Sequence, residues 1–90
     1  MNDQETNQRA SDALALTALG WILGDQKRAD RLLALTGLSP ADLRDGLSDP
    51  ALLAAVLGFL EAHEPDLLAC AEALGVDPAR LIAARASLER

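Results

Sequence analysis

His63 is the only histidine, and three carboxylates lie close to it in the sequence, at Glu61, Glu64 and Asp66. Imidazole and carboxylate both bind metals, but a metal site needs several such ligands to converge on one point. On a helix Glu61 points about 160° away from His63, and Glu64 and Asp66 suit the first turn of a following helix. We therefore predict no metal site, and we expect His63 near the last carbonyls of its helix.

Cys70, the only cysteine, is the second candidate for chemistry. A nucleophilic thiol needs a base or positive charge beside it, whereas Ala69, Ala71 and Glu72 are its sequence neighbours. The pattern favours a small buried apolar side chain. With no Tyr, no Ser–His–Asp arrangement and no Gly-Lys-Ser/Thr phosphate loop, the sequence predicts no catalytic residue, no cofactor and no small-molecule ligand.

Trp21 and Arg85 are the candidates for an interface. Trp21 lies among apolar neighbours, which favours a core position, although an exposed Trp would be a natural anchor for a partner. Arg85 follows Leu81 by four positions, so it projects from the apolar side of its helix. Its stem can pack on the core with the guanidinium in water. The alternative is an ion pair with an acidic residue across the bundle or across a subunit interface.

One segment, residues 71–81, fits the spacing of a helix-turn-helix motif. The recognition helix would be Pro78–Leu88, with Arg80, Arg85 and Arg90 as the DNA contacts. However, Arg80 and Arg85 lie about 140° apart on a helix, so both cannot face the bases. The pattern also fits any tight pair of helices, and DNA binding is therefore kept only as the alternative function.

The composition limits the classes of partner. The chain has 90 residues, a net charge of −6, and Leu and Ala as most of its hydrophobic residues. An acidic domain is repelled by nucleic acid phosphates and by anionic lipid. The apolar run over residues 13–23 is too short to cross a bilayer, and the polar start resembles no secretion signal. We expect a cytoplasmic protein with no membrane or nucleic acid partner.

Glycine and proline divide the chain into short helices. The segments "GLSP", "GLSDP" and "GVDP" each place a helix-ending Gly before a Ser or Asp cap and a Pro. The predicted fold is all-α, a compact bundle of five to six short helices, with a disordered tail over 1–10 and one domain over 11–90. The predicted helices span residues 11–23, 26–36, 40–45, 49–63, 65–74 and 78–88.

The first and fourth of these helices are apolar around most of their circumference, which is typical of buried helices. We therefore expect both at the centre of the bundle, with Trp21, Leu23, Val56, Phe59 and Leu60 in the core.

Gly20 lies in the first of these helices and Gly58 interrupts the fourth, and Gly24 follows Gly20 by four positions. Glycine inside a helix costs about 1 kcal/mol relative to alanine. Close approach of a neighbouring helix would explain it.

Two segments carry a resemblance to a known family. "RLLALTGLSPADLR" and "DPALLAAVLGFLEAHEPDLLACAEALGVDPARLIAAR", together with Trp21, resemble short bacterial proteins of the domain of unknown function 3572 family, over about 12–88. The resemblance implies a small all-helical cytoplasmic protein and carries over no catalytic residue. A His at position 63 is not a fixed feature of that family. The leading interpretation is a non-enzymatic protein-interaction module whose partner is another protein or a second copy of the chain.

Overall fold

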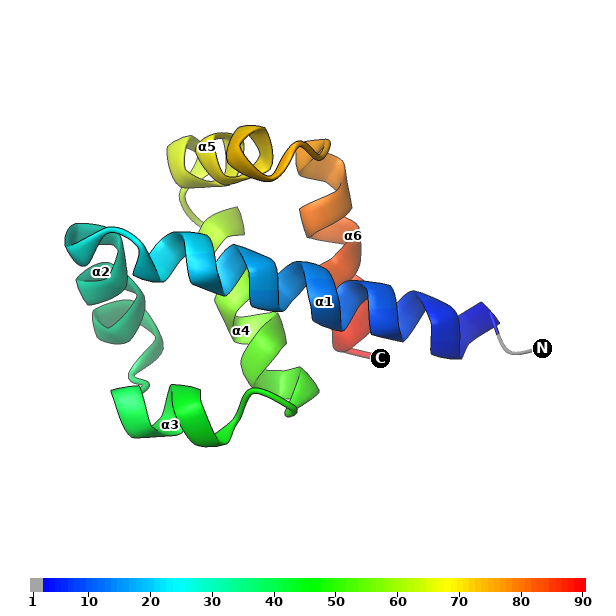
Figure 1. Cartoon of the computed structure of the whole chain (residues 1–90), viewed down its shortest axis with the longest axis horizontal. Coiled ribbons are helices and arrows are strands. Elements are labelled where there is room, and N and C mark those ends of the chain that lie inside the picture. Colours follow the sequence, from blue (N-terminus) through cyan, green and yellow to red (C-terminus); the bar gives the residue numbers. More distant parts are fainter. Residues whose placement is uncertain (1–2) are drawn as a thin grey trace.

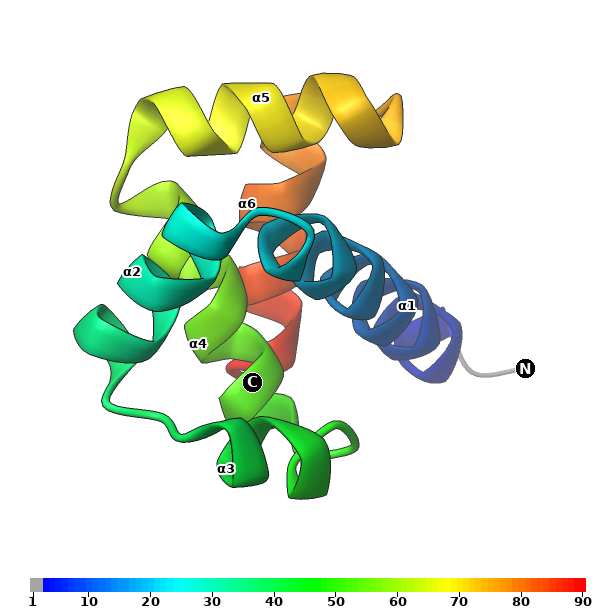
Figure 2. The ribbon, with the colours of Figure 1, turned by 60° about the vertical axis from the view of Figure 1, so that its left-hand side comes forward.

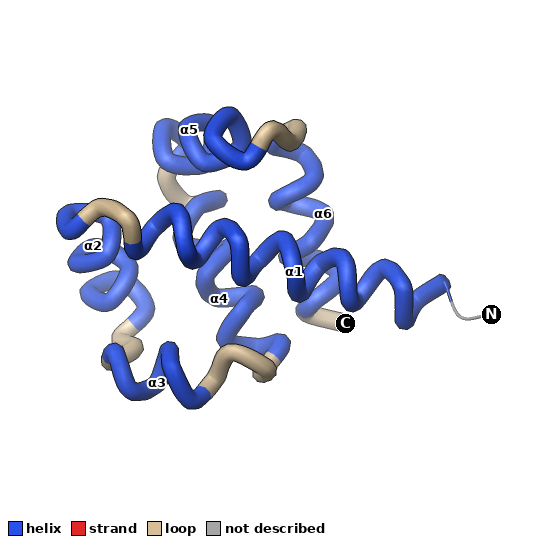
Figure 3. The backbone as a smooth tube through the Cα atoms, viewed as in Figure 1, coloured by secondary structure: helices blue, strands red, loops and turns tan. Residues whose placement is uncertain are grey.

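The computed structural model describes residues 3–90, with side chains from Arg9 onward, and within that range it contains helices and no strand (Figure 3). The predicted all-α fold is confirmed. The six helices are α1 (Asp3–Leu23), α2 (Gln26–Thr36), α3 (Pro40–Asp45), α4 (Pro50–Glu61), α5 (Glu64–Leu74) and α6 (Pro78–Leu88).

The helix ends follow the predicted punctuation. Gly37 ends α2 and Gly75 ends α5, both in the left-handed conformation, with φ of 75° and 70°. Ser39, Asp49 and Asp77 each accept a hydrogen bond from a backbone N–H in the first turn of the next helix, and each precedes a Pro. The chain therefore turns where glycine permits a left-handed residue and restarts where a short side chain satisfies free N–H groups.

The first helix is longer than expected. It begins at Asp3 rather than near Ser11, so the predicted start is wrong. No Gly or Pro occurs between residues 3 and 19, and extending an existing helix adds a hydrogen bond for each residue that is fixed. The predicted disordered tail over 1–10 overlaps α1 from Asp3 onward, and residues 1 and 2 lie outside the described part of the chain.

Three helices form the centre of the bundle. α6 packs against α1, α4 and α5, and α4 also packs against α1 and α2. Figure 1 shows α1 lying along the long axis of the molecule, across α4 and α6. In Figure 2, α5 and α3 lie at opposite ends, with α4 running between them. The first and last helices of the chain are therefore direct neighbours.

The core lies between α4 and its neighbours, and Val56, Phe59 and Leu60 are buried as predicted. Leu23 was placed wrongly, because its side chain is 47% exposed, and Trp21 is only partly buried. The buried and exposed residues of α1 alternate with the helix turn, so α1 is buried on one face rather than all round. That face consists of Ser11, Ala15, Ala18, Leu19 and Ile22.

Candidate functional site

A cluster of charged side chains surrounds Asp66 in the first turn of α5. The Asp66 residue is buried, and its Oδ2 atom lies 2.9 Å from Arg31 Nη2 and 3.0 Å from His63 Nδ1. Arg31 Nη2 also donates a hydrogen bond to Asp66 Oδ1 at 3.2 Å. The buried carboxylate therefore faces the Arg31 guanidinium from α2 and the His63 imidazole from the residue before α5.

His63 is not at the end of α4 as expected. Its backbone is extended, with φ of −134°, and it occupies the N-cap position of α5. α4 ends at Glu61, two residues before the predicted end, and Pro65 fits the first turn of α5. The imidazole therefore faces Asp66 rather than the last carbonyls of α4. In the described part of the chain, no group of three or more His, Cys, Asp or Glu residues could hold a metal ion.

Trp21 is held by Arg28 across the turn between α1 and α2. The Arg28 guanidinium carbon lies 3.7 Å from the centroid of the indole ring, which is a cation–π contact. The same guanidinium donates to the Trp21 carbonyl oxygen at 2.7 Å and contacts Asp25 Oδ2 at 3.4 Å. One face of the indole ring is thus covered by Arg28 of the same chain. Trp21 lies at the edge of the core rather than at its centre.

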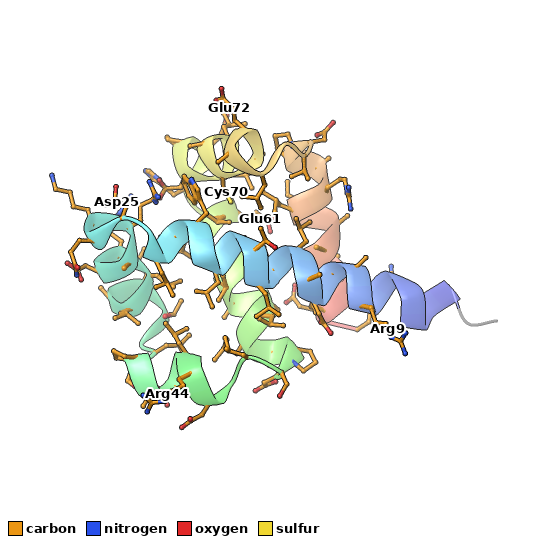
Figure 4. All side chains as sticks on the ribbon, in the orientation of Figure 1. Arg9, Asp25, Arg44, Glu61, Cys70 and Glu72 are labelled. Carbon is orange, nitrogen blue, oxygen red and sulfur yellow. The ribbon has the colours of Figure 1, made fainter. Side chains whose placement is uncertain are left out.

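Cys70 lies on α5, on the side that faces α1 (Figure 4). Its side chain is fully buried, which agrees with the sequence interpretation. Burial raises the pKa of the Cys70 thiol to about 11, and the positive charge of Arg28 offsets that only in part. A thiol with so high a pKa carries almost no thiolate at neutral pH, so Cys70 is not equipped to act as a nucleophile.

The buried thiol leads to a prediction for alkaline pH. An unfolded chain ionises Cys70 near pH 9, whereas the folded chain keeps it protonated until about pH 11. The folded state therefore binds more protons in this range, and its stability is expected to fall from about pH 9 to pH 11. Few other side chains titrate between pH 9 and pH 11, because the chain has no Tyr and Lys27 is its only Lys.

Urea unfolding measured at steps across this pH range checks the expectation. Cys70→Ala should flatten the dependence, whatever its effect on stability at pH 7. An equal slope in wild type and variant would contradict a perturbed thiol.

Arg85 forms the ion pair across the bundle that was one of the two sequence interpretations. Its Nη1 lies 2.7 Å from Glu61 Oε2 on α4, and its Nε lies 3.2 Å from Glu89 Oε1. The hydrogen bond to Glu61 and the charge of Glu89 raise the pKa of the Arg85 guanidinium. A Cβ at Gly58 would lie 3.4 Å from Arg85 Nε, so this glycine leaves room for the guanidinium between α4 and α6.

A shallow groove lies beside this ion pair, between α4 and α6. Ala51, Ala54 and Ala55 contribute small side chains to it, and Asp49 and Glu89 contribute carboxylates. Asp49 already accepts the N–H of Ala51, and Glu89 contacts Arg85. These two carboxylates therefore have structural partners, the first turn of α4 for Asp49 and the Arg85 guanidinium for Glu89.

The three arginines of the DNA-binding alternative differ in whether their charge is available to DNA. Arg80 and Arg90 are exposed, but Arg85 is held by Glu61 and Glu89. α6 also packs against α1, α4 and α5, so much of its surface is covered. Of the proposed recognition helix, only Arg80 offers an exposed cation in the first turn, and Arg90 follows the last turn.

The largest feature that sequence reasoning missed is the outer face of α1. Residues 13–24 contain no charged residue. Six of them form an exposed stripe on the side away from the core, which we call the α1 outer face: Ala13, Leu16, Thr17, Gly20 and Leu23 of α1, and Gly24 directly after its end. The signal was present as an uncharged run. It was overlooked because a helix with apolar residues on all sides was interpreted as a helix that is buried on all sides.

These features define a small all-helical domain with two paired charge clusters and one uncharged helix face. The chain matches the family described as protein of unknown function (DUF3572) over residues 8–90 and belongs to that family. No curated protein and no solved structure matches the chain. Among the described residues, no helix is both long enough and apolar enough to span a membrane.

Proposed function

We propose that this protein is a non-enzymatic interaction module, which binds another protein surface through the α1 outer face. The observation that carries the proposal is the charge-free stretch over residues 13–24 on a chain of net charge −6. Leu16 and Leu23 on that stretch are 40% and 47% exposed. Contiguous apolar surface on a small domain typically marks a site of protein contact.

The two charge clusters support a structural rather than a catalytic role for the polar residues. Arg31 and Asp66 connect α2 to α5, and Arg85 and Glu61 connect α6 to α4. Each pair joins helices that are distant in sequence, so these side chains act in holding the bundle. The proposed interaction surface is the α1 outer face, which contains none of these charged residues.

Site-specific photo-cross-linking in the producing cell tests the proposal. A photoreactive side chain at position 16 is expected to give a defined covalent adduct, because Leu16 lies on the α1 outer face. The control is position 35 on α2, where Leu35 is 72% exposed and lies outside that face. Equal adducts at both positions, or none at position 16, would contradict a specific surface on α1.

The helix-turn-helix alternative rests on the sequence pattern and on exposed Arg80. α5 and α6 follow one another through a tight turn and cross steeply (Figure 1). If the domain bound DNA, binding in low salt would be lost on Arg80→Ala and would weaken steeply with added salt. We expect no DNA binding in low salt from the wild-type chain, measured by fluorescence anisotropy with a labelled duplex.

A further inference from the structure

We propose that the occupant of the α1 outer face is a second copy of this chain, whose α1 lies antiparallel to the first. This inference rests on the proposed interaction function and names its partner. Four observations support it: the empty space at Gly20, the absence of charge, the spacing of the small residues and the positions of the larger ones.

Gly20 has no packing explanation inside the chain. A Cβ built at this position meets no atom within 4 Å, so the close helix crossing expected from the sequence is not made within the molecule. Glycine is less favourable than alanine in a helix interior. Its use here is explained when the backbone of another helix approaches this point.

The uncharged surface suits contact between two copies of the same acidic chain. Each copy carries a net charge of −6, so two copies repel one another. The charge-free residues 13–24 form a stretch about 18 Å long, where contact buries no charge. The Thr17 hydroxyl donates to the Ala13 carbonyl at 2.9 Å, so its hydrogen-bonding need is met within α1.

The small residues of the face have a spacing that is unchanged when the helix is reversed. Ala13, Thr17, Gly20 and Gly24 are separated by four, three and four positions. When an antiparallel copy is centred between Thr17 and Gly20, Thr17 faces Gly20 of the second copy and Ala13 faces Gly24. A two-fold dimer needs such a self-complementary patch, because both partners contribute the same surface.

The larger side chains then fall beside one another instead of colliding. At about 100° per residue, Leu16 and Leu23 form one border of the stripe, and the partly buried Leu14 and Trp21 form the other. A two-fold axis that reverses the helix keeps each border on its own side. Leu16 therefore lies beside Leu23 of the second copy, and Leu14 lies beside its Trp21.

The size of this face predicts a weak dimer. One helix face of this length falls below the roughly 1,200 Å² of standard interfaces, which is the range of transient contacts. We therefore expect a reversible dimer whose population rises with protein concentration. Because salt screens the repulsion between two acidic copies, added salt should strengthen the association. By contrast, added salt would weaken binding to a partner of opposite charge.

Sedimentation velocity over a wide range of protein and salt concentrations is the first experiment. Wild type should shift from monomer to dimer as either concentration rises. Gly20→Gln should weaken association by at least about tenfold, because its side chain enters the centre of the contact. The same change should raise the melting temperature at concentrations where wild type is monomeric, since Gln favours helix over Gly and a Cβ at this position meets no atom within 4 Å.

Leu35→Gln is the matched control. It also places a glutamine at an exposed helix position, but Leu35 lies on α2, away from the α1 outer face. This variant should associate as wild type does. Loss of association in both variants, or in neither, would overturn the proposal.

Disulfide trapping tests the orientation. A mixture of Thr17→Cys and Gly20→Cys chains should form a mixed disulfide faster than either chain forms its own, because these positions face one another when α1 is antiparallel. In a parallel pair, each position would face its own copy. Cys70 does not compete, since it is fully buried. Faster self-linking of the Thr17→Cys chain would overturn the antiparallel arrangement.

The outcomes separate this inference from the proposed function. If the chain remains monomeric at every concentration and salt level, the second copy is excluded. A position-16 adduct to a different protein would then leave the interaction function standing. If the chain is monomeric and position 16 also gives no specific adduct, both the inference and the proposed function fail.

Discussion

Replacing Leu60 with alanine is expected to lower the free energy of unfolding by about 2–5 kcal/mol. Leu60 lies near the end of α4 and has no exposed surface. Its replacement removes buried apolar contact and leaves a cavity that surrounding helices fill only in part. The loss is large for this chain, because small domains have total stabilities near the lower end of about 5–15 kcal/mol.

Urea unfolding followed by circular dichroism measures this loss. Leu35→Ala serves as the control, because the same chemical change is made at a side chain that is 72% exposed. It should change the stability by no more than about 0.5 kcal/mol. Similar losses in the two variants would show that Leu60 is not in a packed core.

Replacing Asp66 with asparagine should cost about 1.5–3 kcal/mol of unfolding free energy, the range for a hydrogen bond to a charged group. The Asp66 carboxylate is buried and faces Arg31 and His63. Its negative charge also lies in the first turn of α5, where the helix dipole stabilises it. The loss stays below that of a fully buried ion pair, because Arg31 and His63 are partly exposed and regain water.

Glu64→Gln is the control for Asp66, since it removes an exposed carboxylate from the same helical turn. A double-mutant cycle with Arg31→Gln then separates the pair from the dipole. The two losses should be less than additive, because each change breaks the same contact. Full additivity would show that Arg31 and Asp66 do not interact in solution.

Sequence reasoning reached most of the fold, because the signals that set it are local. A left-handed Gly37 or Gly75 needs no information from the rest of the chain, and neither does the Ser39 cap. The errors occurred where no local signal marks a boundary or a face. α1 extends past Ser11 because nothing stops it, and Leu23 is exposed because a uniformly apolar helix does not show which side is covered.

The charge clusters were much less accessible to prediction. Arg31 and Asp66 are 35 positions apart, and Arg85 and Glu61 are 24 apart. Arg85 could be recognised because a charge on an apolar helix side needs a partner. Its partner could not be named, since the crossing of α4 and α6 decides which carboxylate lies within reach. Arg28 carried no signal, because only the turn at Gly24 brings it over Trp21.

The contact between α1 and α6 has a consequence for how the bundle comes apart. Because the first and last helices pack against each other, we expect the packed part of α1 and α6 to unfold together. α3 takes no part in this contact and is anchored by Leu43, its one buried residue. With so little buried surface, α3 is expected to open locally before the rest of the bundle unfolds, which amide hydrogen exchange would show as weak protection of α3.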